Sequence, residues 1–352
     1  MTQKSIKIST NSKVFIVLFA LAIIGLYFFY RSYHSIMAPN VKVESNKGKL
    51  IYIPTGSTYS YVLSMLKDED ILIDTSSFKR TASRMGYPHS VKPGCYKITK
   101  GMSNRKLINM LRAGLQTPVK VTFNNVRTPE QIAGKIGGQI EADSLSIITL
   151  FRNPGTAAKY NLAPETLIAI FTPNTYEFFW TTSAEELFER MHKEYQRFWN
   201  DERIEKAAAL NLNKEEVITL ASIVEEESVK KDERPRIAGV YINRIRKGIP
   251  LQADPTIKFA VGDFGLRRIL TKHLNIDSPY NTYKNRGIPP GPINSPSISA
   301  IDAVLNYEQH SYLYFCAKAD FSGYHAFART LTEHNKNARE YQRALNRQRI
   351  YR

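Results

Sequence analysis

The sequence has 352 residues, of which 43% are hydrophobic and 23% charged, and its 49 lysines and arginines against 32 acidic residues give a formal net charge of +17. This composition excludes a disordered or low-complexity chain, and the length is sufficient for two modest domains. The positive balance indicates either an anionic neighbour or simply a basic, solvated surface. Because no zinc-finger, RRM-like or helix-turn-helix signature is present, we expect no nucleic-acid partner.

The N-terminus predicts a membrane anchor. Residues 1–13 contain three lysines and no acidic residue, and residues 14–30 carry no charge. A helix of that length spans roughly 25 Å, which is enough for a bilayer core. The positive-inside rule then makes residues 1–13 a cytoplasmic tail and places residues 31–352 on the periplasmic side of the inner membrane. A cleaved signal peptide fits less well, because the small-residue site before Pro39 has a bulky Ile36.

A short polar stalk is predicted over residues 31–47, followed by a small α+β module over residues 48–122. Ile51 and Ile53 alternate before a Pro-Thr-Gly turn, which predicts a strand, and Ser57 is expected to cap the helix after it. The expected elements are a strand from residue 49, helices over 57–72 and 74–87, a strand and a helix within 92–114, and a strand over 117–123.

The remaining residues, 123–352, are predicted to form a larger α+β domain. Residues 128–140 and 183–199 have helical patterns, with an aromatic, strand-like stretch between them. Two polar loops, 251–256 and 280–296, are stiffened by proline, which lowers the cost of holding one shape. Such loops can present the oriented donors, acceptors and stacking faces of a carbohydrate groove. The candidate groove residues are Gln252, Asp254, Thr256, Asn281 and Tyr283.

Cysteine and histidine usage indicates no metal site. Cys95 and Cys316 lie far apart in the sequence and are expected to be two unrelated thiols, although an exported location would permit a bridge. The seven histidines are scattered, and no Cys/His cluster has zinc spacing. We therefore expect neither a metal nor a cofactor.

Three consecutive glutamates end an apolar run at residues 221–228, ASIVEEES. On a helix that advances about 100° per residue, Glu226 falls on the wet side, whereas Glu225 and Glu227 fall within the apolar arc. A carboxyl group in apolar surroundings gains a raised pKa, as a general acid requires. The alternative is that both make inward salt bridges with arginine or lysine. The helical pattern alone leaves both interpretations open.

Five separated segments resemble, in order, the endolytic murein transglycosylases of the MltG (YceG-like) family. They are ASIVEEES, VYINRIRKGIPLQADPT, YNTY, GIPPGPINSP and HAFARTLTEHN. The resemblance implies that residues 48–122 are a LysM-like module. It assigns the catalytic acid to Glu225 and a second acidic position to Glu227, with Glu227, the loop residues above and His325 contacting the substrate. Two departures are Asn174, where the family usually has an acid, and Ala253, where a polar residue is common.

The resemblance also implies a reaction. Glu225 would protonate the glycosidic oxygen between N-acetylmuramic acid and N-acetylglucosamine and then take the proton of the muramic C6 hydroxyl, closing a 1,6-anhydro ring without an activated water. The enzyme would cut nascent glycan strands and terminate their elongation, with the peptidoglycan synthases (penicillin-binding proteins) as partners.

Two other functions stay open at this point. One is a non-catalytic peptidoglycan-binding scaffold for wall synthases, which has no need for an acid within the apolar arc. The other is a hydrolase, which would need a second carboxylate, for which Asp254 is the loop candidate.

Overall fold

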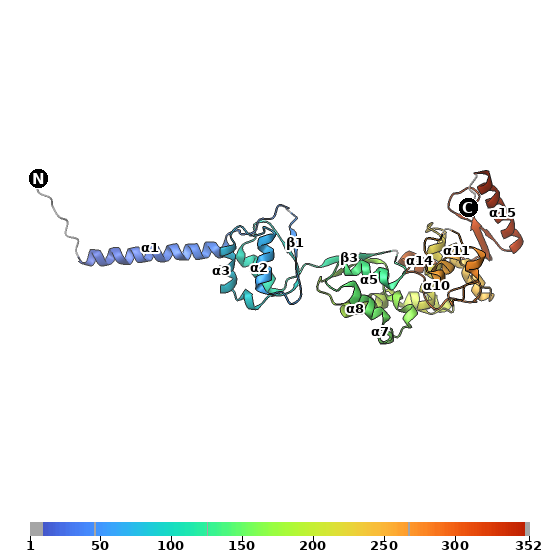
Figure 1. Ribbon diagram of the computed structural model, residues 1–352, viewed down its shortest axis with the longest axis horizontal. Helices are drawn as coiled ribbons and strands as arrows, with labels where there is room; N and C mark the ends of the chain where they lie inside the picture. Colours follow the sequence, from blue (N-terminus) through green and yellow to red (C-terminus); the bar gives the residue numbers. More distant parts are fainter. Residues whose placement is uncertain (1–9, 46, 125, 267, 349–352) are drawn as a thin grey trace. The chain divides into compact units, whose positions relative to one another are not determined.

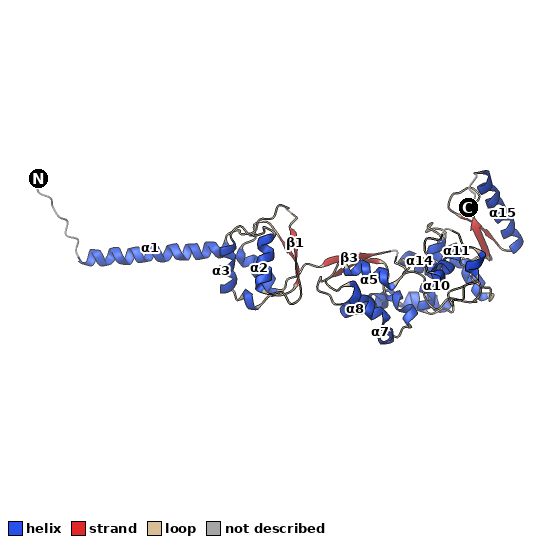
Figure 2. Ribbon diagram, in the orientation of Figure 1, coloured by secondary structure: helices blue, strands red, loops and turns tan. Residues whose placement is uncertain are grey.

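The computed structural model describes residues 10–45, 47–124, 126–266 and 268–348. The chain divides into two compact units (Figure 1), Met1–Val119 with Glu177–Thr181 and Lys120–Tyr176 with Thr182–Arg352. Both units mix helices with two-stranded sheets (Figure 2). The predicted α+β class is therefore confirmed.

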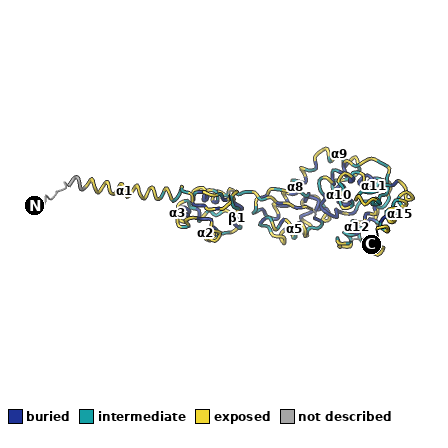
Figure 3. The backbone as a smooth tube through the Cα atoms, turned by 90° about the horizontal axis from the view of Figure 1, so that it is seen from above, coloured by how far each residue is buried: buried dark blue, intermediate teal, exposed yellow. Residues whose placement is uncertain are grey.

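Helix α1 (Thr10–Met37) contains the predicted membrane span. Its segment Val14–Met37 has a mean hydropathy of 2.3, and within the described chain it is the one helix long and apolar enough to cross a membrane. Every residue from Val14 to Arg31 is exposed (Figure 3). Such an apolar, uncovered helix is consistent with a single-pass anchor.

The segment after the apolar run is not a free stalk. The carbonyl oxygen of Ser35, near the end of α1, accepts hydrogen bonds from Ser77 Oγ at 3.0 Å and Asn104 Nδ2 at 2.8 Å. Val41 and Val43 then lie in the hydrophobic core of the small unit. The small unit therefore begins before residue 48, because residues of the supposed stalk supply both hydrogen bonds and apolar surface to it.

The small unit combines a two-stranded sheet with three short helices. Strands β1 and β2 are antiparallel, with Ile51 opposite Tyr96, and the predicted alternation buries Ile51 and Ile53. Thr58, one residue after the predicted Ser57, caps the first helix. The elements are β1 (Lys49–Ile53), α2 (Tyr59–Asp68), α3 (Thr75–Arg84), the 3-10 turn η1 (Tyr87–His89), β2 (Gly94–Ile98) and α4 (Asn104–Ala113). The LysM-like character of this unit stays a prediction.

The chain passes between the units within β3 (Val119–Phe123) and β4 (Asn174–Phe178), which pair as a two-stranded sheet. The rings of Phe151, Phe171 and Phe188 lie within 5.0 Å of one another by centroid and form an aromatic core in the larger unit. The helices around it are α5 (Pro129–Gly137), α6 (Ser144–Arg152), α7 (Pro154–Lys159), the 3-10 helix η2 (Pro164–Ile170), α8 (Ala184–Phe198) and α9 (Asp201–Ala209).

Helix α10 (Lys214–Glu227) is central in the larger unit and carries the three glutamates at its end. Asn213 caps it in a capping box with Glu216. All residues from Val217 to Val224 are buried, against α11 and α14 among others. The other elements are α11 (Arg234–Arg246), α12 (Asp254–Val261), α13 (Thr271–Leu274), α14 (Ile298–Leu305), β5 (Tyr314–Ala317), β6 (His325–Ala328) and α15 (Leu331–Arg347).

Candidate active site

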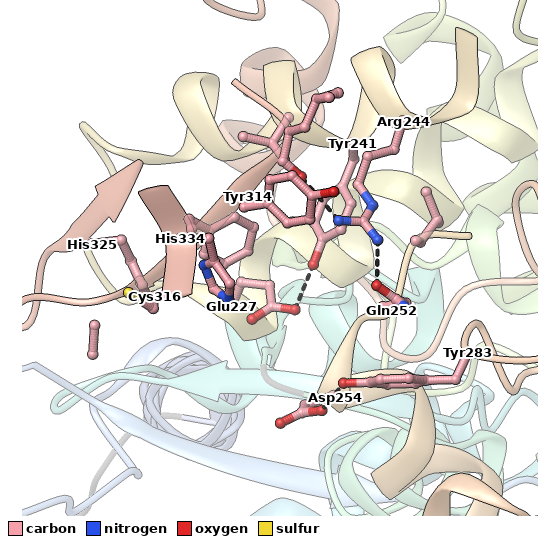
Figure 4. A pocket seen from close by; sticks show the side chains of 15 residues that line it. Glu227, Tyr241, Arg244, Gln252, Asp254, Tyr283, Tyr314, Cys316, His325 and His334 are labelled. Carbon is pink, nitrogen blue, oxygen red and sulfur yellow. Dashed lines mark hydrogen bonds between the residues drawn. The ribbon is translucent and has the colours of Figure 1, made fainter. Parts of the chain in front are cut away.

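A pocket of about 440 Å³ opens beside the C-terminal end of α10, entirely within the larger unit (Figure 4). Its walls come from α10, α11, the chain before α12, β5, β6 and α15. The polar side chains that line it are Glu227, Tyr241, Arg244, Gln252, Asp254, Tyr283, Tyr314, Cys316, His325 and His334. Four of the loop and strand residues expected in a substrate groove, namely Gln252, Asp254, Tyr283 and His325, are therefore brought together with one glutamate.

Glu227, the last residue of α10, is the glutamate in this pocket. Its carboxylate accepts a hydrogen bond from the Tyr241 hydroxyl at 2.6 Å. The pKa of Glu227 is raised to about 7, mainly by burial and also by the charge of Asp254, and the Tyr241 hydrogen bond opposes the increase. A carboxyl group that is partly protonated near neutral pH can both donate and accept a proton.

Two hydrogen-bonded pairs of polar side chains in the pocket are held in fixed orientations, Arg244 with Gln252 and Tyr283 with Asp254. Gln252 has a left-handed backbone with φ of 52°, which is rare for a residue other than glycine or asparagine. The buried Arg244 donates to Gln252 Oε1 at 2.5 Å and to the carbonyl oxygens of Pro250 and Leu313. The hydroxyl of Tyr283 donates to Asp254 Oδ1 at 2.6 Å. The pocket is thus built of oriented polar groups, as recognition of a sugar requires.

Glu225, expected to be the catalytic acid, lies elsewhere. Its carboxylate makes an ion pair with Arg234 Nη1 at 2.9 Å and accepts hydrogen bonds from the Ser297 amide at 2.9 Å and hydroxyl at 2.6 Å. Among the residues that the structure describes, Glu225 is not one of those that line the pocket. Of the two interpretations that the helical pattern left open, the inward salt bridge is the one that describes Glu225. The pattern placed Glu225 and Glu227 in the same apolar arc and therefore could not distinguish their roles.

Glu226 lies on the exposed side of α10, as the helical pattern predicts. It pairs with Arg127 at 3.0 Å and accepts a hydrogen bond from Asn294 Nδ2 at 2.9 Å. Glu225 and Glu227 are both less exposed than Glu226. The predicted separation of one outward and two inward glutamates is therefore confirmed.

Thr256 and Asn281, also expected to contact substrate, are fully buried instead. Thr256 Oγ1 donates to the Ala253 carbonyl at 2.7 Å, and Asn281 Nδ2 donates to the carbonyls of Leu274 and Ile276. Their side chains hold the loops from within, because a buried polar group needs hydrogen-bond partners. Residues 251–256 are also not all loop, since α12 begins at Asp254.

Several pocket residues were not predicted from the sequence. Tyr241 and Arg244 stand three positions apart on α11, so they share one face of that helix. Tyr314 and His334 stack with a centroid distance of 5.4 Å, and burial lowers the pKa of His334. The sequence held a signal for the first pair, because two large polar side chains at helical spacing follow the glutamates closely.

The remaining expectations concern cysteines, Asn174 and metals. Both Cys95 and Cys316 are free thiols, as predicted. Asn174 is exposed on β4 and, among the described residues, is not part of the pocket lining. The described residues contain no group of three or more His, Cys, Asp or Glu side chains suited to a metal ion.

A raised-pKa carboxyl group in a polar pocket, beside a second carboxylate, is typical of enzymes that cleave glycosidic bonds by acid catalysis. The comparisons agree with this class. Residues 51–340 match the model of the YceG-like family. The chain belongs to this family.

The relatives from Bacillus subtilis and Streptococcus pneumoniae carry the same name. The endolytic murein transglycosylase of Bacillus subtilis is 33% identical over 336 residues, which are 91% of each chain. That of Streptococcus pneumoniae is 30% identical over 363 residues, which cover 93% of this chain and 64% of the pneumococcal one. A crystal structure of a putative YceG-like protein from Listeria monocytogenes matches with a TM-score of 0.55 and 29% identity, over 83% of this chain and 99% of that chain.

Proposed function

We propose that this chain is an endolytic murein transglycosylase, which cuts the bond between N-acetylmuramic acid and N-acetylglucosamine within peptidoglycan glycan strands. The family and the names of its relatives support the reaction class. The observation that carries the proposal is the carboxyl group of Glu227, in the pocket and with a pKa of about 7.

We assign the general acid to Glu227 in place of Glu225. Glu227 protonates the glycosidic oxygen, so the bond from that oxygen to the muramic C1 breaks and the leaving sugar departs with a free 4-hydroxyl group. The C6 oxygen then bonds to C1 and passes its proton to a base in the same pocket, which gives the 1,6-anhydro end. Glu225 does not suit this work, because its carboxylate already accepts from Arg234 and Ser297.

A hydrolase acting on the same bond is the second candidate, and one observation favours it. Asp254 lines the same pocket, and it retains Oδ2 after Oδ1 has accepted the Tyr283 hydrogen bond. A second carboxylate could activate water, as in ordinary glycosidases. A non-catalytic scaffold, the remaining alternative, would not need a proton-donating group in the pocket.

Mass spectrometry of digested glycan separates these candidates. Purified peptidoglycan strands are incubated with the protein, with the Glu227→Gln variant as the control. We expect 1,6-anhydro ends from the wild-type protein and none from the variant. Reducing ends would indicate hydrolysis, and the absence of any product from a folded wild-type protein would indicate a scaffold.

The topology of the anchored chain is a further proposal. We infer that residues 1–13 face the cytoplasm and that the chain after α1 lies outside the inner membrane, where peptidoglycan is found. Protease added to the outer face of spheroplasts is expected to digest the body and leave a stub that contains α1. Full resistance to the protease would contradict this orientation.

The biological role follows from the reaction. An enzyme that cuts nascent strands near the membrane terminates their elongation, and peptidoglycan synthases are its expected partners. Cells that lack the activity are then expected to make longer glycan strands, which chromatography of isolated strands would measure. Unchanged strand length would contradict the terminator role without affecting the reaction.

A further inference from the structure

A buried carboxylate outside the proposed reaction lies next to the pocket. Glu233 precedes α11, and 3% of its side chain is exposed. Its Oε2 lies 2.6 Å from His325 Nδ1, and its Oε1 accepts the backbone N–H of the same histidine at 2.8 Å. Ser228 Oγ also donates to Oε2 at 3.3 Å, and within the described chain no lysine or arginine pairs with this carboxylate. A carboxylate this deeply buried needs hydrogen-bond partners to offset the cost of desolvation, and His325 supplies two of them.

The two contacts fix the histidine completely. With both carboxylate oxygens accepting, Nδ1 carries its proton and the ring is held in one orientation. Phe315 packs edge-on against the ring at a centroid distance of 5.3 Å. The other nitrogen, Nε2, has no hydrogen-bond partner among the residues the structure describes, and His325 lines the same pocket as Glu227. With the proton on Nδ1, Nε2 is left with the lone pair that can accept a hydrogen bond from a substrate hydroxyl.

We propose that His325, held by Glu233, is a second catalytic residue that accepts the proton of the muramic C6 hydroxyl during ring closure. This inference rests on the proposed function and divides its two proton transfers between two groups. Glu227 gives its proton to the leaving oxygen as the C1–O bond breaks. The C6 oxygen bonds to C1 and passes its proton to Nε2. Solvent then returns a proton to Glu227 and removes one from the imidazolium.

The surrounding charges suit this role. Glu233 lies against Nδ1 and stabilises the imidazolium as it forms, as a carboxylate does in other carboxylate–histidine pairs. Glu227 and Asp254 add negative charge to the same pocket, and Arg244 is the one arginine that lines it. The division also removes a demand on Glu227, which need not lie within reach of both the leaving oxygen and the C6 hydroxyl.

The substitution Glu233→Gln tests the tautomer. The His325 backbone N–H needs an acceptor, so the glutamine oxygen takes the place of Oε1 and its amide NH₂ faces Nδ1. That nitrogen must then be the acceptor, and the proton moves to Nε2, which can no longer accept one. We expect kcat to fall about 100-fold with KM nearly unchanged. Asp232→Asn, one residue earlier and exposed, is the matched control and should keep full activity.

The substitution His325→Ala keeps the proposal testable if Glu233→Gln does not fold. We expect a similar loss of kcat and partial recovery on adding imidazole, which can enter the open pocket and act as the missing base. Thermal melts monitor folding. Full activity of folded His325→Ala overturns the proposal, and so does a rise in KM alone or a loss that imidazole does not relieve. Failure of the proposed function is distinguishable, because Glu227→Gln would then remain active.

Discussion

Glu225 and Glu227 lie two residues apart at the end of one helix, yet their surroundings differ in kind. The Glu225 carboxylate accepts from Arg234, whose side chain is 7% exposed, and from two groups of Ser297. The Glu227 carboxylate has one neutral donor, Tyr241, and a nearby negative charge on Asp254. The first site supplies a cation and two further hydrogen-bond donors to its carboxylate, whereas burial at the second site raises the pKa of Glu227.

The difference shows how a fold assigns roles to identical side chains. A carboxylate paired with a buried arginine is held in place and serves stability. A carboxylate without a cationic partner is left able to exchange a proton and can serve chemistry. Substitutions of the three adjacent glutamates by glutamine can therefore separate the two roles, since each removes one charge and preserves shape.

The largest effect is expected for Glu227→Gln. The amide cannot donate the proton that the leaving oxygen requires, so turnover of glycan strands should fall by about 10²- to 10⁴-fold. The fold should be retained, because the Tyr241 hydroxyl can still donate to the amide oxygen. Anhydro-sugar formation and a thermal melt measure the two quantities. A folded variant with wild-type turnover would remove Glu227 from the reaction.

The next effect is on stability, in Glu225→Gln. The change leaves the buried guanidinium of Arg234 without its counter-charge, which we expect to cost about 2 kcal/mol or more of unfolding free energy. Activity per folded molecule should persist. Chemical denaturation measures the loss, and adding Arg234→Met should recover part of it, because the unpaired charge is then removed. A stable, inactive Glu225→Gln protein would restore Glu225 as the acid.

The pH dependence of stability should also distinguish the sites. The pKa of Glu227 is about 7 in the folded protein, against an ordinary value of 4.5 for a glutamate in the unfolded chain, so the folded state binds more protons than the unfolded state between those pH values. The free energy of unfolding should therefore fall as pH rises from about 4.5 to about 7, by at most about 3 kcal/mol. Glu227→Gln should lose less stability over that range. Melts of both proteins across the range would show parallel curves if this assignment were wrong.

The smallest effect is expected for Glu226→Gln. Its pair with Arg127 is partly exposed, with side-chain exposures of 36% for Arg127 and 27% for Glu226, and such pairs contribute about 1 kcal/mol or less. Turnover should be unchanged, because the side chain points away from the pocket. This variant is the matched control for the other two. A folded but inactive Glu226→Gln protein would contradict the orientation of the whole helix end.

Local patterns in the sequence predicted most elements and part of the site. Alternation at Ile51 and Ile53 identified a strand, and the helical pattern placed Glu226 on the exposed side of its helix. Both predictions succeeded because strand and helix patterns depend only on residues that are close in the sequence. The choice between Glu225 and Glu227 was beyond the pattern, since Arg234 and Ser297 reach Glu225 only through tertiary packing.

The position of the two polar loops could also be predicted from the sequence, but the orientation of their side chains could not. Proline and polar composition located the chain around the pocket, and Gln252, Asp254 and Tyr283 do line it. Composition could not show which polar side chains turn inward. Thr256 and Asn281 bond to backbone carbonyls beneath the surface, and only the folded path of those loops determines this.

The union of α1 with the small unit has a mechanical consequence. The Ser35 carbonyl accepts hydrogen bonds from Ser77 and Asn104, so α1 continues into the small unit and its end is fixed to that unit. Each residue inserted into α1 before Ser35 would therefore rotate the small unit by about 100° about the helix axis and move it by about 1.5 Å along that axis. Four inserted residues would move the unit by about 6 Å along the helix axis and leave its orientation about that axis nearly unchanged. Two inserted residues would rotate it by about 200°.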